Sequence, residues 1–318
     1  MRKILQIDRS KLFLSFLLIV VTYLGLLFYG DISKVALDIG KFKLWVILLG
    51  FFLAFNNYIF RFFKWEYYLK RLSIKIPLIT SFLIYISGFI LTLTPGKLGE
   101  VFRSFLLKER FNIAVSRTAG IVIADRLTDL FALMIIAGIG SLFFNYGWLI
   151  ILLVFLIISF VTLVIEIEGI GEFFLKLIKR IPSIGDRLYK IFKDSYSSLR
   201  EVAKVSFQLI PLIFSIVAWS FECLSLYFIV NYGIRFYNIS LLEAFFIYSF
   251  STIAGALAFL PAGLGLTEAS ITALLILFCN LPKSYSVTST IIVRIVTLWF
   301  AIFLSIIALF LLKKRRSF

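Results

Sequence analysis

Two stretches of the sequence share a pattern that decides the fold: LTLTPGKLGEVFRS, residues 91–104, and LAFLPAGLGLTEAS, residues 257–270. Each contains Pro-x-x-Leu-Gly, follows an apolar run and precedes a glutamate. Proline and glycine interrupt helices, and irregular backbone at membrane depth is tolerated only where protein shields it or where it lines a water-filled cavity. The pattern therefore predicts two interrupted helical hairpins that border a cavity, if the flanking runs lie in a membrane.

The composition is that of a polytopic membrane protein. The chain has 318 residues, 61% of them hydrophobic and 18% aromatic, and its mean hydropathy is +1.04, whereas soluble domains contain roughly 45–50% apolar residues. Six runs are long enough to cross a hydrocarbon core of roughly 30 Å: residues 12–29, 44–60, 127–144, 148–165, 207–230 and 287–312. Shorter or interrupted runs are residues 78–94, 241–260 and 266–281. The predicted fold is all-α, a bundle of membrane helices.

Positive charge gathers between the apolar runs. The formal net charge is +16, and basic residues concentrate in residues 169–206 and 313–316. Because cytoplasmic loops carry an excess of lysine and arginine, both segments and both termini are predicted to be cytoplasmic in a multi-pass plasma-membrane protein. Residues 31–43 are expected to form a short outer loop, and Arg61 and Lys64 to belong to an inner loop. Since the charge follows membrane topology, no nucleic-acid partner is expected.

The two interrupted stretches are predicted to approach the membrane from opposite sides. A complete crossing by residues 78–94 would place the basic residues after it outside, so a hairpin that starts and ends in the cytoplasm is favoured. The second hairpin, residues 241–281, then starts and ends outside, and its arms are long enough that they could also cross fully. The expected tips contain Pro95, Gly96, Gly99, Pro261, Gly263 and Gly265.

A second correspondence suggests an inverted repeat. Arg126 follows the first tip, and Arg294 the second, at similar distances along the chain. Inverted repeats whose broken helices meet near the bilayer midplane are typical of secondary transporters. We expect a single integral membrane domain, with repeat halves at residues 44–165 and 207–312, joined by a cytoplasmic amphipathic helix at residues 169–206.

Ionisable residues lie within the membrane segments, around the two tips. Burying such a group costs about 2.5–3.5 kcal/mol on insertion scales, so each is a functional hypothesis. Arginines near broken helix ends favour binding of a phosphate headgroup, because guanidinium binds phosphate oxygens bidentately. Neighbouring carboxylates could bind a proton or an ammonium group. The candidate substrate-binding residues are Glu100, Arg103, Asp125, Arg126, Asp129, Glu222, Glu268 and Arg294.

A structural alternative pairs these charges with one another, for example Glu100 with Arg126 or Glu268 with Arg294, to hold the interrupted helices together. The sequence contains no histidine and no phosphate-binding loop for ATP. Its two cysteines, Cys223 and Cys279, fall inside apolar runs and imply no disulfide. We therefore expect no metal, no cofactor and no catalytic residue, and a driving force other than ATP hydrolysis within this chain.

The motifs resemble those of a known family, the transmembrane (flippase) domain of lysylphosphatidylglycerol synthases and the stand-alone membrane proteins related to it. TPGKLGEVFRS is similar to its Pro-Gly-x-x-Gly-Glu-x-x-Arg, ADRLTDLFAL to its Glu-Arg-x-x-Asp, and LPAGLGLTEAS to its Pro-Gly-Gly-Leu-Gly-x-x-Glu. Asp125 stands in place of the usual glutamate, and Ala262 in place of a glycine. The resemblance implies lipid translocation without aminoacyl transfer.

Three functions stay open at this stage. The first is a flippase or transporter for an anionic or aminoacylated phospholipid, or for a polyprenyl-phosphate-linked lipid. The second is a membrane-embedded glycosyltransferase or lipid-modifying enzyme that uses an isoprenoid phosphate. The third is a small-solute transporter, or a scaffold for a cytosolic partner through residues 169–206. Membrane lipids with an anionic headgroup are the expected partners, and the sequence leaves homo-oligomerisation open.

Overall fold

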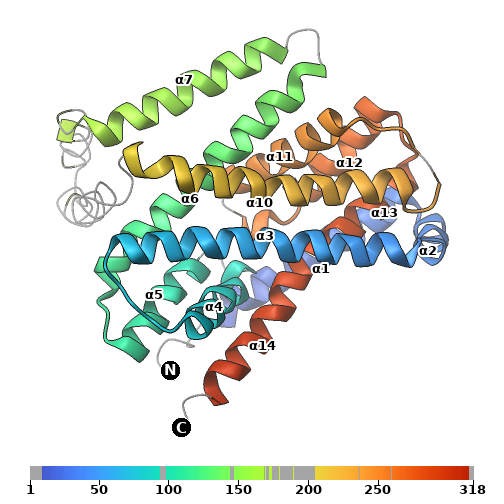
Figure 1. Ribbon diagram of the computed structural model, residues 1–318. Coiled ribbons are helices and arrows are strands. Elements are labelled where there is room, and N and C mark those ends of the chain that lie inside the picture. The colour runs from blue at the N-terminus through green and yellow to red at the C-terminus, as the bar shows by residue number, and fades with distance from the viewer. Residues whose placement is uncertain are drawn as a thin grey trace.

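The fold is an all-helical bundle, as predicted, in the part of the chain that the structure describes (Figure 1). This computed structural model describes residues 9–93, 98–143, 147–167, 205–235, 237–258 and 260–314, and the separate residues 169, 172, 173, 179 and 189. The predicted amphipathic helix at 169–206 therefore lies almost wholly outside the described residues.

The N-terminal segment forms two helices that meet at a sharp bend. Helix α1 (Arg9–Gly30) is followed by α2 (Ile32–Gly40), and the two helix axes differ by 92°. The prediction of a loop at residues 31–43 is thus wrong for residues 32–40, because Asp31 caps a new helix there: its carboxylate accepts a hydrogen bond from the Ser33 amide at 3.2 Å. Such a cap satisfies amide groups that have no partner inside the helix.

Helix α3 (Leu44–Arg71) runs well past the end of the second apolar run. Its 28 residues span about 42 Å, and it packs lengthwise against α10 (Figure 1). Arg61 and Lys64 are therefore buried helical residues, and their assignment to an inner loop is wrong. The helix continues through these charges because both side chains find partners inside the bundle.

The first interrupted stretch forms a helical pair. Helix α4 (Leu78–Ser87) continues as a 3₁₀ segment, η1 (Gly88–Leu93), and α5 (Leu98–Phe111) packs back against both. The tip residues Pro95 and Gly96 lie outside the described residues. Gly99 belongs to the first turn of α5.

Helix α6 (Val115–Gly140) starts earlier than the apolar run predicted. Asp125 and Arg126 were expected to open this span, but they lie in its interior, because buried ion pairs allow the helix to extend through charged residues. After the short segment η3 (Ser141–Phe143), helix α7 (Gly147–Glu166) packs against α6 and η3 and is set apart at the top of Figure 1.

The second interrupted stretch breaks the helix where the sequence predicted. Helices α10 (Val205–Tyr232) and α11 (Leu241–Leu257) are followed by a short turn, η4 (Pro261–Gly263), and by α12 (Leu266–Cys279). Ala262, Gly263 and Gly265 have φ of 54°, 67° and 88°, in the left-handed region. Gly255 lets this tip approach α11, because a Cβ at residue 255 would lie 1.9 Å from Thr267 Oγ1.

The last long helix contains a π-helical turn. Helix α13 (Lys283–Arg294) passes through η5 (Ile295–Trp299) into α14 (Phe300–Lys314). The Tyr58 hydroxyl donates a hydrogen bond of 2.5 Å to the Thr297 carbonyl in this turn. Such π-turns inside helices are frequent at functional sites, and this one directly follows Arg294.

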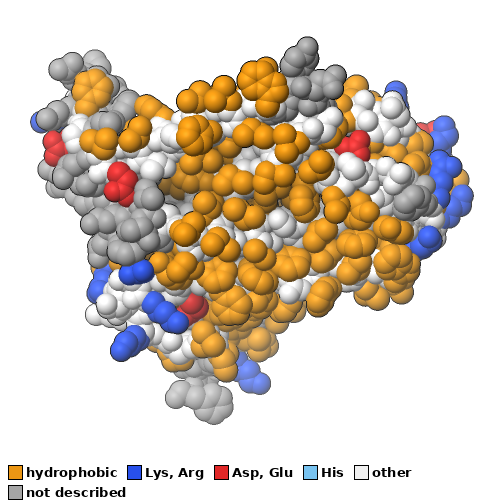
Figure 2. All heavy atoms as spheres, turned by 45° about the horizontal axis from the view of Figure 1, so that its top comes forward, with side chains coloured by type: hydrophobic (Ala, Val, Ile, Leu, Met, Phe, Trp, Pro, Cys, Tyr) orange, Lys and Arg blue, Asp and Glu red, His pale blue; other side chains and the backbone are white. Residues whose placement is uncertain are grey.

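The surface has the distribution expected of a membrane protein. In Figure 2, a broad apolar face lies between two ends at which lysine and arginine gather. Within the described residues, four helices are long and apolar enough to cross a membrane, or five if the bent pair α1–α2 is counted as one span.

Candidate functional site

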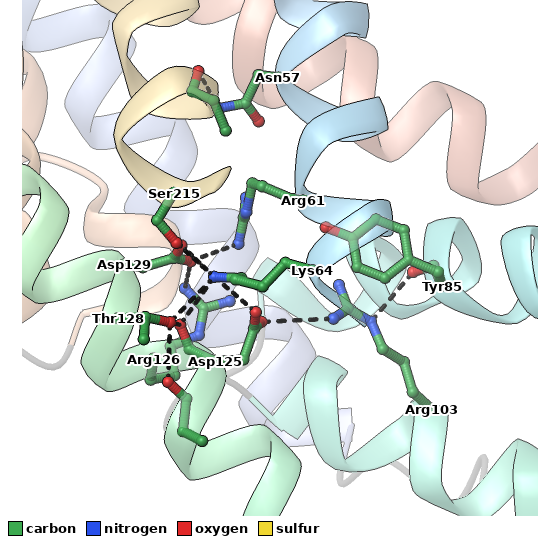
Figure 3. A network of polar contacts seen from close by, with 12 residues as sticks. Asn57, Arg61, Lys64, Tyr85, Arg103, Asp125, Arg126, Thr128, Asp129 and Ser215 are labelled. Atoms are coloured by element: carbon green, nitrogen blue, oxygen red, sulfur yellow. Dashed lines mark hydrogen bonds and ion pairs between the residues drawn. The ribbon is translucent and has the colours of Figure 1, made fainter. Parts of the chain in front are cut away.

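A buried cluster of charges lies where α3, α6 and α10 meet, with Lys64 at its centre (Figure 3). The Lys64 Nζ lies 2.7 Å from Asp125 Oδ1 and 2.6 Å from Asp129 Oδ1, and its side chain is 0% exposed. The ammonium also donates to Ser215 Oγ at 2.8 Å. The spacing of four residues places both aspartates on one face of α6. The cluster thus joins three helices through a single ammonium group.

Arg61 lies one turn before Lys64 on α3 and shares Asp129 with it. The Arg61 Nη2 donates to Asp129 Oδ2 at 2.9 Å, and the guanidinium lies 5.2 Å from the centroid of the Trp219 ring. Two buried donors nearby, Arg61 Nε and Trp219 Nε1, have no hydrogen-bond acceptor among the described residues. Both side chains belong to the wall of a cavity.

Arg103 approaches the same cluster from α5. Its Nη1 lies 3.8 Å from Asp125 Oδ2, and its Nε donates to the Tyr85 carbonyl at 3.1 Å (Figure 3). The guanidinium also stacks 4.1 Å from the Tyr85 ring centroid. Within the described part of the cluster, four cations share two carboxylates, because the Arg126 Nη1 also lies 3.9 Å from Asp129 Oδ2. This arrangement gives the region an excess of positive charge.

A second charged group holds the tip between α11 and α12. The Arg294 Nε donates to Glu268 Oε1 at 2.6 Å, and its Nη2 donates to the Ala262 carbonyl at 3.0 Å. Glu268 Oε2 in turn accepts from the Gly265 amide at 2.7 Å. The pairing of Glu268 with Arg294 that the structural alternative anticipated is present. It connects α13 to the irregular backbone of the tip.

A single cavity connects these two groups. Its volume is about 180 Å³, and its walls come from both hairpins and from α3, α6, α10 and α13. The end of the first hairpin, η1, packs against the tip of the second, η4. The charged side chains in the walls are Arg61, Arg126, Asp129, Glu222 and Arg294.

The predicted site residues divide into two layers around the cavity. Four of them contribute to its walls: Arg126, Asp129, Glu222 and Arg294. The other three lie behind the walls: Glu268 pairs with the wall residue Arg294, Asp125 pairs with Lys64, and Arg103 pairs with Asp125. The side chain of Glu100 lies outside what the structure describes.

Sequence reasoning missed Arg61 and Lys64. The apolar run that predicts this span ends at Phe60, and hydropathy alone therefore predicts a loop for both charges. A usable signal was present, because Asn57, Arg61 and Lys64 recur at spacings of four and three residues and share a helix face. This spacing indicates that the helix continues beyond Phe60 and includes both charged residues.

The fold and the buried charges define a multi-pass membrane protein with an internal, charged cavity. The chain belongs to the family of the lysylphosphatidylglycerol synthase TM region, which matches residues 12–305. The resemblance seen in the motifs is thereby confirmed.

Two curated archaeal proteins are similar to this chain. The UPF0104 membrane protein MJ1078 of Methanocaldococcus jannaschii is 28% identical over 57% of this chain and 76% of its own length. The UPF0104 membrane protein PH1989 of Pyrococcus horikoshii is 23% identical over 96% of this chain and 98% of its own length.

Proposed function

We propose that the protein carries a phosphate-bearing lipid across the membrane through the cavity between its two hairpins. The substrate class is an anionic or aminoacylated phospholipid, or a polyprenyl-phosphate-linked lipid, and the shared chemistry is the phosphate group. The observation that carries the proposal is that Arg61, Arg126 and Arg294, from three different helices, line the same cavity. Guanidinium groups bind phosphate oxygens through paired hydrogen bonds.

The unpaired donors support an anionic occupant. Arg61 Nε and Trp219 Nε1 are buried at the cavity and have no acceptor among the described residues. A buried donor without a partner costs about 1–3 kcal/mol, and a phosphate oxygen in the cavity would accept from these groups. The volume of about 180 Å³ is roughly that of ten water sites, which is enough for a headgroup but not for acyl chains.

Movement of the headgroup is best explained by displacement of the hairpins. The cavity walls include η4 and the end of η1, which are irregular and pack against each other. In secondary transporters, broken helices form the central site, and alternating access is largely rocking or gating of one repeat against the other around it. In this proposal the acyl chains stay in lipid while the phosphate passes the arginines.

Reconstitution tests the proposal. Purified protein is placed in vesicles that contain fluorescent phosphatidylglycerol, and dithionite bleaches the fluorophore on the outer leaflet. Wild-type protein should make the inner-leaflet lipid accessible, and Arg126→Gln should slow this by roughly 10–100-fold, because a hydrogen bond to a charged group contributes about 1.5–3 kcal/mol.

A matched control is Arg71→Gln, which changes an exposed arginine at the end of α3. It should flip lipid at the wild-type rate. Equal rates for Arg126→Gln and wild type would remove Arg126 from the site, and no flipping by wild type with any phosphate lipid would contradict the proposal. A chemically altered lipid in the same vesicles, found by mass spectrometry, would point to an enzyme instead.

A further inference from the structure

One buried carboxylate of the cavity differs from the others in its partners. Asp129 and Glu268 each lie 2.6 Å from a lysine or arginine nitrogen, and Asp125 lies 2.7 Å from one. Glu222 is 6% exposed and accepts a hydrogen bond of 2.5 Å from the Tyr248 hydroxyl. Among the described residues, it has no lysine or arginine within the 4.0 Å that defines an ion pair.

Several charged and titratable groups face Glu222 across the cavity. They come from every helix that packs around it there, and they are Tyr58 and Arg61 of α3, Arg126 and Asp129 of α6, Tyr248 of α11 and Arg294 of α13. Arg61 and Arg294 already have their own carboxylate partners. An ionised Glu222 therefore adds a negative charge that no ion pair offsets directly.

At this position, an ionised Glu222 would repel an anion that enters the cavity. Two negative charges in a buried cavity repel strongly, because the effective dielectric is far below that of water. A proton on Glu222 removes that repulsion, so the arginines can bind the anion. Asp129 and Glu268 already pair with cations, and the chain has no histidine. Glu222 is thus the wall residue best suited to exchange a proton.

We infer that Glu222 is a proton-binding site linked to the anion site, so that the protein takes up a proton as a phosphate headgroup binds. The inference rests on the proposed function and adds the coupled ion to it. Binding linkage is reciprocal, so protonation strengthens anion binding as much as the anion strengthens protonation. Anion affinity should therefore be highest at low pH and fall as the pH rises through the Glu222 titration.

The test measures proton uptake and binding together. Dihexanoyl-phosphatidylglycerol is titrated into the full-length protein in detergent, in weakly buffered solution with a pH-sensitive dye. Wild type should take up about one proton per bound lipid near the midpoint of the affinity–pH profile. Glu222→Gln should bind the lipid with an affinity that no longer depends on pH and without proton uptake.

Two further variants separate this role from a structural one. Tyr248→Phe keeps the carboxylate but removes the hydrogen bond that favours its charged form, so the midpoint should move to higher pH. Glu166→Gln changes an exposed glutamate at the end of α7 and should behave as wild type. If Tyr248→Phe leaves the midpoint unchanged, Glu222 is not the titrating group.

The outcomes distinguish the two proposals. Lipid binding by wild type without proton uptake, or uptake that persists in Glu222→Gln, would overturn the inference and leave the proposed function in place. Absence of binding at every pH would overturn both. Glycerol phosphate serves as the second probe. Proton uptake with glycerol phosphate supports coupling to the phosphate group alone. Proton uptake with the lipid but not with glycerol phosphate supports a coupled site that also needs the acyl chains.

Discussion

At the scale of the residue, Lys64 shows how a full charge is kept inside a membrane bundle. Its ammonium lies 2.7 Å from Asp125 and 2.6 Å from Asp129, on a side chain that is 0% exposed. Ser215 supplies a further acceptor at 2.8 Å. A buried charge is tolerable only when it is paired and hydrogen-bonded in this way. Removal of one partner should therefore be far more harmful than removal of a surface lysine.

Replacement of Lys64 by methionine keeps the length of the side chain but leaves two buried carboxylates with fewer cations. Lys64→Met should lower the free energy of unfolding by about 3–5 kcal/mol, measured from thermal unfolding in detergent. Lys70→Met, an exposed position on the same helix, should change it by less than about 0.5 kcal/mol. Equal melting of the two variants would show that the cluster does not stabilise the fold.

The tip residue Ala262 has a backbone conformation that glycine adopts more readily than alanine does. Its φ is 54°, in the left-handed region, which an alanine adopts at a cost of about 1–2 kcal/mol. Ala262→Gly should therefore raise the free energy of unfolding by about 0.5–1 kcal/mol. Ala254→Gly, within helix α11, should lower it by about the same amount. The melting temperatures of the two variants should move in opposite directions, and a fall for both would contradict the argument.

At the scale of the element, breaks in helices are held by specific side chains. The tip between α11 and α12 is fixed by Arg294, which donates to Glu268 and to the Ala262 carbonyl. The π-turn η5 follows the same arginine, and the Tyr58 hydroxyl bonds one of its carbonyls. A break at membrane depth needs such partners, because lipid offers no hydrogen bonds to free backbone groups. The two breaks share Arg294 as their common neighbour.

Loss of Glu268 should loosen the second tip. In Glu268→Ala, the Gly265 amide loses its acceptor and Arg294 loses its ion pair, so amide hydrogen exchange in residues 261–266 should accelerate. Glu243→Ala is the matched control, because Glu243 caps α11 through the Ser240 amide at the same distance of 2.7 Å. It should accelerate exchange at the start of α11 alone. Unchanged exchange at residues 261–266 in Glu268→Ala would show that the tip does not depend on this pair.

At the scale of the whole molecule, the basic ends define an axis across the membrane. At one end of the molecule, the Arg117 guanidinium donates to the Leu72 carbonyl. This hydrogen bond connects the start of α6 to the residue that follows α3. At the other end, Lys283 lies 5.2 Å from the Tyr29 ring centroid. Between the ends, the surface in Figure 2 is apolar. The end with Leu72 also contains the basic end of α14, with Lys313 and Lys314 in its last turn. Because lysine and arginine concentrate on the cytoplasmic side, we propose that this end is cytoplasmic.

Labelling with a membrane-impermeant maleimide tests this orientation. Lys283→Cys should react in intact cells, and Lys75→Cys only after the membrane is permeabilised. Both lysines are exposed, at opposite ends of the molecule. The native cysteines lie within α10 and at the end of α12, and Cys223 is buried, so wild-type protein provides the background. The reverse pattern would invert the proposed topology.

The sequence predicted the class of fold and singled out several of the charged residues that line the cavity. Hydrophobic runs located the helices, since a membrane span needs a long apolar segment, and Pro-x-x-Leu-Gly marked the break at residues 261–265. Arg126, Asp129, Glu222 and Arg294 were identified because charges inside apolar runs are rare. The inverted repeat remains a prediction, and so do its two halves.

The remaining features depended on contacts between distant segments. A hydropathy run ends at the first charges, so it predicts Arg61 and Lys64 in a loop and a later start for α6 than the structure has. Their positions inside the helices follow from ion pairs between residues more than 60 positions apart, which no local pattern contains. The bend before α2 was missed in the same way, although its cap, Asp31, is visible in the sequence.

The sequence by itself determined that this chain is a multi-pass helical membrane protein of its family, where its second helix break falls, and several of the ionisable residues that lie within its apolar helices. These properties follow from local composition and spacing, because they depend on residues that are close together in the sequence. Only the tertiary structure decided which charges meet, which of them face the cavity, and that Glu222 alone among the described wall carboxylates lacks a cation partner. The physical reason is that a buried charge is stabilised by its partners in space, and these come from other helices.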